Sequence, residues 1–427
     1  MRRSHFGLIA LATVLAAFTL PAQTIAITGG TVYPVSGPVI KNGTVIITKG
    51  KITAVGANVA IPAGATKIDA TGKWVTPGLV NAATAVGLFD VGFGADANEA
   101  SAEGADHVSA SFQPWLAYDP ENVLIPNNRE YGITTAGIWP RGNLVAGQGA
   151  FVDLGSGSLA SVLLKGPVGM SASFEGNRNA GVGAEGELIA KLRELLDNTK
   201  AYMANKAAYN GAKMLPFAFR RQDMDAMIPV VTGRIPLVLD VDRASNIIQA
   251  LKLGTDYKLK LVLSGASEGW MVATEIAAAK VPVLVGAMSN IPYSFTSLNS
   301  RQENAAMLKK AGVTVVLIGN AGGGDEEAFN IRNIRYEAGN AVGYGMSWDD
   351  ALAAITWAPA VVFGVSDKVG ALKPGMEGNV VIWNGDPFEF ATRAEHVYIR
   401  GVENTTPSRQ DLLTQRYKNL PADYTKP

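Results

Sequence analysis

Histidine and cysteine, the side chains that most often hold a catalytic transition metal, are nearly absent from this chain. Its 427 residues include three histidines, His5, His107 and His396, and no cysteine. Only His107 and His396 lie beyond the first 22 residues, and they are far apart in the sequence. A metal ion that activates water needs several convergent His or carboxylate ligands around an open position. The sequence therefore predicts that no histidine-ligated catalytic metal centre forms, and it offers no thiolate nucleophile.

Three carboxylates, Asp240, Asp242 and Glu268, follow two apolar runs that we expect to be neighbouring strands. Because Asp240 and Asp242 are two residues apart, their side chains can lie on the same face of a strand end. The three together predict either a weak oxygen-ligand site for Ca²⁺ or Mg²⁺ or an acid–base pair. Asp242 has structural alternatives, an ion pair with Arg243 or an N-cap for the helix expected from Ala244. Asp240 is therefore the strongest catalytic candidate.

The other candidates are binding residues and loops. Arg243 and Trp270 are expected to contact a ligand from the loops that follow the strands. The glycine-rich segment 319–325 predicts a flexible closure rather than a phosphate loop, because neither Lys nor Ser/Thr follows in P-loop spacing. No Gly-x-Ser-x-Gly elbow is present, so a Ser/His/Asp triad is not expected, whereas Ser–Lys chemistry stays open. Aromatic residues near loop or strand ends could line an apolar or sugar-stacking pocket or pack in the core: Trp115, Tyr118, Trp139 and Trp270.

Apolar runs and helical patterns alternate through the middle of the chain. Near-continuous apolar strands between helices are typical of a parallel sheet buried on both faces. Units of about 20 to 30 residues favour a (β/α)8 barrel, with its active site at the carboxyl ends of the strands, over a doubly wound open sheet. The runs are 235–239, 259–263, 281–285 and 313–318, and the helical patterns are 181–210, 244–253, 271–280 and 302–311.

Both ends of the chain are expected to form strands. Strand patterns in 25–75 and near 379–400 predict one small β-sandwich domain assembled from both termini. Residues 90–129 interrupt the strand–helix alternation and predict a lid-like insertion over the barrel mouth. The expected divisions are a signal peptide at 1–22, a first sandwich part at 23–73, the barrel at 74–362, a second sandwich part at 363–407 and a tail at 408–427.

Composition and the first residues limit where the protein works. Lys plus Arg and Asp plus Glu both number 37, so the zero net charge gives no general attraction to nucleic acid or to an anionic membrane. Arg2 and Arg3 precede an apolar stretch at 7–20 and small residues at 21–23, which is typical of a cleaved secretory signal peptide. An uncleaved amino-terminal anchor is the alternative. We expect a periplasmic or secreted protein with no further membrane segment.

Residues 74–85, WVTPGLVNAATA, resemble the first barrel strand of the amidohydrolase superfamily, near its imidazolonepropionase-like members. Three further segments are similar to family motifs: DATGK at 69–73, ALAAIT with a following Pro-Ala pair at 351–360, and GALKPG at 370–375, which leads to Asp386-Pro387. The resemblance extends over nearly the whole chain that follows the signal peptide. It implies a (β/α)8 barrel with a composite β-sandwich.

The resemblance also locates the metal ligands of the family, and the residues at those positions differ. The two histidines of the first strand correspond to Ala83 and Ala85, which have no donor atoms. The fifth-strand histidine corresponds to Asp240, and the sixth-strand histidine falls near 264–266, where none occurs. The eighth-strand aspartate matches Asn320, a catalytic candidate by position, although an amide is neither a useful base nor an anionic ligand.

By resemblance, the activity is hydrolysis of carbon–nitrogen bonds other than peptide bonds in a small molecule. Lys165, near the end of the strand-like run 162–164, is a candidate binding residue, similar in place to a lysine that, once carboxylated, bridges two metals in some relatives. Here it has no other ligands to join, which favours a surface or ion-paired lysine. We therefore expect no zinc or iron cofactor and an activity that is weak, absent or metal-independent. One alternative is a small-ligand-binding or scaffold protein that pairs with an active paralogous amidohydrolase, and another is an enzyme with a centre reassigned to Asp240, Asp242 and Glu268. A homodimer is expected from the family.

Overall fold

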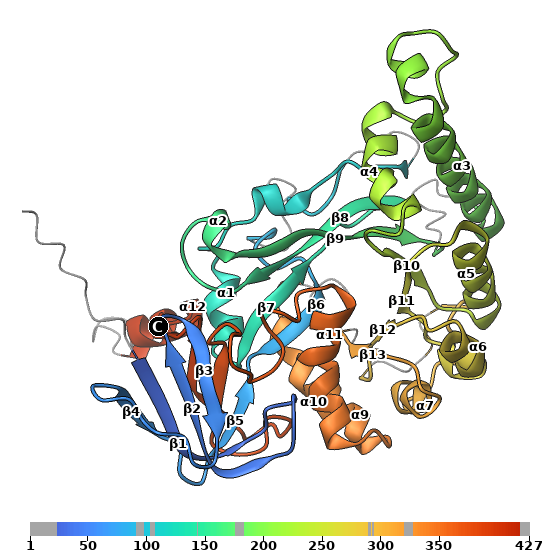
Figure 1. The fold of residues 1–427 in the computed structure, drawn as a ribbon. Coiled ribbons are helices and arrows are strands. Elements are labelled where there is room, and N and C mark those ends of the chain that lie inside the picture. The colour runs from blue at the N-terminus through green and yellow to red at the C-terminus, as the bar shows by residue number, and fades with distance from the viewer. Residues whose placement is uncertain are drawn as a thin grey trace, which may run out of the picture.

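The computed structural model describes residues 24–90, 98–102, 107–142, 144–175, 183–288, 292, 294–319 and 328–418 (Figure 1). The expected signal peptide at 1–22 and the candidate residue Asn320 lie outside these ranges. Among the described residues, no helix combines the length and the apolar character that a membrane crossing requires. Two sheets organise the chain, one built from its two ends and the other from its middle.

The two ends of the chain form one mixed sheet of eight strands, drawn in blue and red in Figure 1. Its order is β16-β15-β14-β5-β1-β2-β3, and β4 pairs with β1. β14 pairs antiparallel with β5, with Val380 opposite Pro77, so a strand from the carboxyl end extends the sheet that the amino end begins. This confirms the separate domain of strands from both termini. The bounds are β1 Thr24–Val32, β2 Ile40–Thr48, β3 Lys51–Gly56, β4 Thr66–Asp69, β5 Trp74–Pro77, β14 Val380–Trp383, β15 Ala394–Ile399 and β16 Val402–Glu403.

The middle of the chain forms a second eight-stranded sheet, from β6 to β13 in sequence order. Its end strands β6 and β13 contact each other, so the sheet is a nearly closed barrel, which confirms the predicted fold class. One strand differs from the expected parallel arrangement, because β8 runs antiparallel to both β7 and β9. The bounds are β6 Leu79–Thr84, β7 Ile133–Ile138, β8 Val145–Asp153, β9 Leu163–Ser173, β10 Leu237–Val241, β11 Leu261–Gly265, β12 Val283–Val285 and β13 Val315–Leu317.

Helices with one apolar side cover the outside of the barrel. In α5 the side chains of Ile247, Ala250 and Leu251 recur at helical spacing and are buried, and the helix ends at Lys258 in a left-handed conformation. The helical patterns predicted from the sequence correspond to α3, α5, α6 with η5, and α7. The bounds are η3 Pro114–Ala117, α1 Leu124–Arg129, α2 Leu159–Val162, α3 Glu185–Asn210, α4 Arg221–Val231, α5 Ala244–Tyr257, η5 Gly269–Val272, α6 Ala273–Ala278, α7 Asn304–Lys310, η6 Ile331–Asn333, α9 Ile334–Gly343, α10 Trp348–Ala354, α11 Trp357–Val362 and α12 Arg409–Lys418.

The interior of the barrel is packed and is closed at its base. Branched side chains from successive strands, such as Val238, Val262 and Val316, form one apolar cluster with α11 and the residues after it. Phe363, directly after α11, packs against Phe151 with ring centroids 5.2 Å apart. Space for a ligand therefore remains at the carboxyl ends of the strands.

The described part of the predicted 90–129 insertion packs along the side of the barrel. Ser109 N donates to Val145 O at 2.8 Å, and Gln148 N donates to Phe112 O at 2.9 Å. These bonds extend the sheet along the edge of β8 where β7 has already ended. Within this segment Trp115 is 4% exposed and lies against β8, so it belongs to the core rather than to an open pocket.

Candidate functional site

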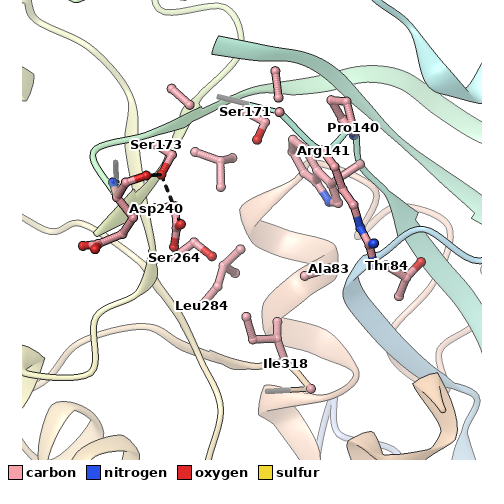
Figure 2. Close-up of a pocket in the computed structure, with 17 residues that line it drawn as sticks. Ala83, Thr84, Pro140, Arg141, Ser171, Ser173, Asp240, Ser264, Leu284 and Ile318 are labelled. Atoms are coloured by element: carbon pink, nitrogen blue, oxygen red, sulfur yellow. Dashed lines mark hydrogen bonds between the residues drawn. The ribbon is translucent and has the colours of Figure 1, made fainter. Parts of the chain in front are cut away.

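A cavity of about 370 Å³ opens at the carboxyl ends of the parallel barrel strands and the amino end of β8 (Figure 2). Residues in or directly after every barrel strand form its wall, and none of the described residues of the insertion does. This is the end of a barrel at which active sites form. The wall consists of Ala83, Thr84, Trp139, Pro140, Arg141, Gly142, Ala146, Ser171, Ala172, Ser173, Glu175, Val238, Asp240, Ser264, Leu284, Ile318 and Gly319.

Asp240 provides a carboxylate at one side of this cavity. It lies in β10 directly opposite Ser264 of β11, and both side chains belong to the cavity wall. Ser173 Oγ, at the end of β9, donates to Asp240 Oδ2 at 3.2 Å, and Glu175 N donates to the same Ser173 Oγ at 3.0 Å. In Figure 2, Asp240, Ser173 and Ser264 lie together, and Arg141 lies on the opposite side. The cavity thus presents groups of opposite charge on two walls.

Asp242 and Glu268 do not share the cavity with Asp240. Asp242 Oδ1 accepts from Ser267 N at 3.0 Å and from the Ser267 hydroxyl, in the turn after β11. Glu268 Oε2 accepts from Ala244 N at 3.0 Å, at the start of α5. Each carboxylate therefore binds the backbone of the loop that carries the other. Glu268, not Asp242, provides the acceptor for the first turn of α5, so the alternative of Asp242 as its N-cap is wrong.

Arg243 and Trp270 lie beside the cavity rather than in its wall. One guanidinium nitrogen of Arg243, Nη2, donates to Phe295 O at 3.0 Å, and Trp270 Nε1 donates to Asn299 O at 2.9 Å. Both side chains thus hold the loop 294–300 against the turns after β10 and β11. In this structure they position a loop and do not contact the cavity.

Lys165 lies at the other end of the barrel. The residue is near the start of β9, and its Nζ donates to Phe363 O at 3.3 Å and to Gly364 O at 3.1 Å. The interpretation of Lys165 as a binding residue placed like a bridging lysine assumed that the strand ended near 164. That assumption is wrong, because β9 continues to Ser173 and reaches the cavity only there.

Sequence reasoning missed three polar residues of the cavity wall that lie near Asp240 or opposite it: Arg141, Ser173 and Glu175. Ser173 ends β9, and Glu175 lies just after it. A prediction that continued this strand through Gly166 and Pro167 would have placed both residues at the barrel mouth. Arg141 directly follows β7 and the Trp139-Pro140 pair, and its guanidinium lies over the Phe89 ring at 4.7 Å. Because active-site residues follow the carboxyl ends of barrel strands, its position after β7 could have identified it as a candidate.

Glu175 connects the cavity wall to the neighbouring strand. Its Oε1 accepts from Asp242 N at 3.0 Å, so the carboxylate holds the end of β10. Burial raises the pKa of Glu175, the nearby Asp242 charge adds to this rise, and hydrogen bonds from Asp242 N and Thr296 oppose it. Glu175 therefore supports Asp240 from the adjacent strand and holds a proton more readily than an exposed carboxyl group does.

The described residues do not fit the metal centre that the resemblance implies. Ala83 lines the cavity, whereas Ala85 is 1% exposed and packs in the core outside the barrel, because β6 ends at Thr84. Neither side chain offers a donor atom. Within the described ranges no group of three or more His, Asp or Glu side chains is placed to hold a metal ion. His396 lies in β15 and pairs with Glu403 at 2.6 Å, away from the cavity.

Comparison with known proteins agrees with this fold. The model of the amidohydrolase family matches residues 261–409. An amidohydrolase of Thermotoga maritima MSB8 superposes with a TM-score of 0.80 and 26% identity, over 90% of this chain and 100% of the other. Molinate hydrolase shares the fold at a TM-score of 0.55 and 20% identity, over 96% of this chain and 98% of the other.

A curated relative, amidohydrolase tasK of Hapsidospora irregularis, is 27% identical over 120 residues, which is 28% of this chain. The match spans only 12% of the length of that relative. The local match in the carboxyl-terminal part and the superposition over most of the chain point to the same group of proteins. The chain belongs to the amidohydrolase superfamily.

Proposed function

We propose that this chain is an exported hydrolase that cleaves carbon–nitrogen bonds other than peptide bonds, in the barrel-mouth cavity and without a histidine-ligated metal ion. Superfamily membership supports the hydrolytic class. The position of Asp240 carries the proposal, since this carboxylate lies in the cavity wall with Ser173 and Ser264 beside it. We expect turnover to be weak, because a metal-activated water is a stronger nucleophile than one activated by a carboxylate.

The charges of the two walls favour a small substrate with an anionic group near Arg141 and a scissile C–N bond near Asp240. Asp240 accepts a proton from a water molecule while the oxygen of that water bonds to the acyl carbon. The same carboxyl group then delivers that proton to the departing nitrogen, so the C–N bond breaks and no other reactant is needed. The Ser264 hydroxyl is placed to donate to the developing oxyanion. Ser173 donates to Asp240 Oδ2 and keeps the carboxylate oriented.

Metal analysis and a chelator test this proposal directly. The full-length purified protein is assayed for hydrolysis of small N-acyl and urea compounds before and after dialysis against a strong chelator. We expect substoichiometric zinc, manganese and iron and an unchanged rate. One equivalent of any of these metals, with activity lost on chelation and restored by the metal, would overturn the proposal.

A matched pair of variants tests Asp240. Asp240→Asn keeps the size of the side chain but removes the base, and we expect the hydrolysis rate to fall by about 10²-fold or more. Asp367→Asn, an exposed aspartate at the other end of the barrel, serves as the control and should not change the rate. Equal rates for Asp240→Asn and the native protein would remove Asp240 from the mechanism.

A binding or scaffold protein is the second candidate, and the absence of donor atoms at Ala83 and Ala85 favours it. On this view the cavity binds a small ligand without turnover, and the chain pairs with itself or with an active paralogous amidohydrolase. Ligand affinity that depends on Asp240 and Arg141, with no hydrolysis by the native protein, would support this candidate over the hydrolase.

A further inference from the structure

A second cavity, of about 410 Å³, lies at the base of the barrel, where β8 ends and β9 begins. Its wall joins the β8–β9 connection to β16 and the residues after it, so it is remote from the barrel mouth. We refer to it as the basal cavity. Arg129, Ser156, Asn404, Thr405 and Thr406 contribute to its wall.

Arg129 is a buried cation at this cavity. The residue ends α1 and is 5% exposed. Its Nη1 donates to Leu154 O at 3.1 Å and to Ser156 Oγ at 3.4 Å, and its Nε has no partner. Among the residues that the structure describes, no carboxylate forms an ion pair with Arg129. Burial lowers the pKa of Arg129, and the charge of Glu121, which forms no ion pair with it among the described residues, opposes this shift. Glu121 Oε1 accepts from Gly157 N at 3.1 Å.

The neighbouring arginine shows how the fold satisfies such a group elsewhere. Arg400 lies in the same wall, and its Nε donates to Asp153 Oδ2 at 2.6 Å. Asp153 also accepts from Asn379 Nδ2 at 2.8 Å, so this carboxylate is already bound by Arg400 and Asn379. Glu403, the other carboxylate of the wall, pairs with His396. The two acids at the basal cavity therefore have partners other than Arg129.

The rest of the wall offers small polar donors. Asn404, Thr405 and Thr406 line the cavity in succession, and among the described contacts their side chains form no hydrogen bonds. Hydroxyl and amide donors around an arginine match an oxyanion, because each oxygen can accept more than one hydrogen bond. These groups line the same cavity as Arg129, which forms no ion pair among the described residues.

We propose that the basal cavity binds a small oxyanion, a phosphate or carboxylate group, with Arg129 as its counter-ion and Asn404, Thr405 and Thr406 as additional donors. This site is separate from the barrel-mouth cavity and does not depend on the hydrolytic function. Because the cavity lies between the two sheets, an anion there would join α1 and the β8–β9 connection to the end of the terminal-strand domain.

Calorimetric titration of the full-length protein with inorganic phosphate tests the site, with succinate as a second arm and sodium chloride matched for ionic strength. We expect saturable binding of phosphate, succinate or both, and at least about tenfold weaker binding in Arg129→Met, which keeps an unbranched side chain but removes the charge. Arg234→Met, an exposed arginine, is the matched control and should bind as the native protein does.

Two further variants test the other donors of the basal cavity and the barrel mouth separately. Thr405→Val with Thr406→Val removes two exposed hydroxyls and keeps the shape, so it should weaken binding even if Arg129→Met does not fold. The binding that Arg129→Met weakens should persist in Arg141→Met, which changes only the barrel mouth. No binding by the native protein, full affinity in the threonine double variant, or loss of binding only in Arg141→Met would each overturn the proposal.

Discussion

Glu268 shows how a buried carboxylate can be committed to the backbone. Its side chain is 4% exposed, and it accepts from Ala244 N at 3.0 Å and from Asn299 Nδ2 at 2.9 Å. The carboxylate thus joins the start of α5 to the loop 294–300. A residue so engaged stabilises the architecture of the site and has little freedom to exchange protons with a ligand.

Replacing this carboxylate should therefore change stability. Glu268→Gln sets an amide N–H₂ against one of these donors, and we expect the free energy of unfolding to fall by about 1–3 kcal/mol. Glu194→Gln, at an exposed glutamate, should change it by less than about 0.5 kcal/mol. Urea denaturation of the three proteins measures both values. Equal stability of all three would show that Glu268 does not hold the loops together.

Glu175 should make stability depend on pH. Because burial raises its pKa in the folded protein, the folded state binds this proton more tightly than the unfolded chain does. The stability contributed by this carboxyl group is therefore greatest below its unfolded pKa of about 4.3 and is lost as the pH rises through the folded pKa. Glu175→Gln keeps the acceptor for Asp242 N, and it removes the loss of stability that deprotonation of Glu175 causes.

The free energy of unfolding of Glu175→Gln should accordingly rise relative to the native protein as the pH increases from about 4 to 7. Urea denaturation at several pH values in this interval measures the difference. Glu194→Gln, at an exposed carboxylate, should show no such rise. A difference that stays constant with pH would show that Glu175 is not desolvated.

At the scale of single residues, the sequence predicted where side chains lie better than what they contact. Asp240 was placed correctly at the end of a barrel strand, because the apolar run before it marks the strand. The roles of Asp242 and Glu268 could not be predicted, since their partners come from loops whose conformation depends on the whole fold. Asn299, for example, is 31 residues from Glu268 in the sequence.

Among the elements, α11 and the residues after it close the base of the barrel. Phe363 is 2% exposed and packs against Phe151 and Trp139, which reaches the cavity wall. Phe363→Ala should reduce the free energy of unfolding by about 3–5 kcal/mol, because it leaves a space among rigid strands. Phe390→Ala, at a ring 72% exposed, is the control with a much smaller expected loss. Similar losses from both substitutions, measured by urea denaturation, would contradict the closed base.

The elements that the sequence predicted well are those whose local pattern agrees with the fold. The apolar runs that overlap β10, β11, β12 and β13 supply side chains to both faces, as a buried barrel strand requires. β9 was predicted too short, because Gly166, Pro167 and Gly169 disfavour a strand and only pairing with β8 and β10 stabilises one there. The antiparallel direction of β8 has no local signal, since it depends on the pairing partners.

For the whole molecule, the sheet of terminal strands links the ends of the chain. β5 leads directly into the first barrel strand and pairs with β1 on one side and β14 on the other. Trp383 of β14 is fully buried, and Gly132, just before β7, has no side chain that would clash with its ring. The carboxyl-terminal strands therefore contribute to the base of the barrel as well as to their own sheet.

Truncation tests this dependence. A chain ending at Gly378 lacks β14 to β16, so it exposes the edge of β5 and the surface that Trp383 covers, and we expect aggregation or the loss of a cooperative thermal transition. A chain ending at Pro407 lacks α12, whose residues are all exposed, and its melting temperature should shift by less than about 4 °C. Circular dichroism and light scattering on heating distinguish the two. If the chain ending at Gly378 melted cooperatively near the temperature of the full-length protein, the barrel would be stable without the strands that the carboxyl end supplies.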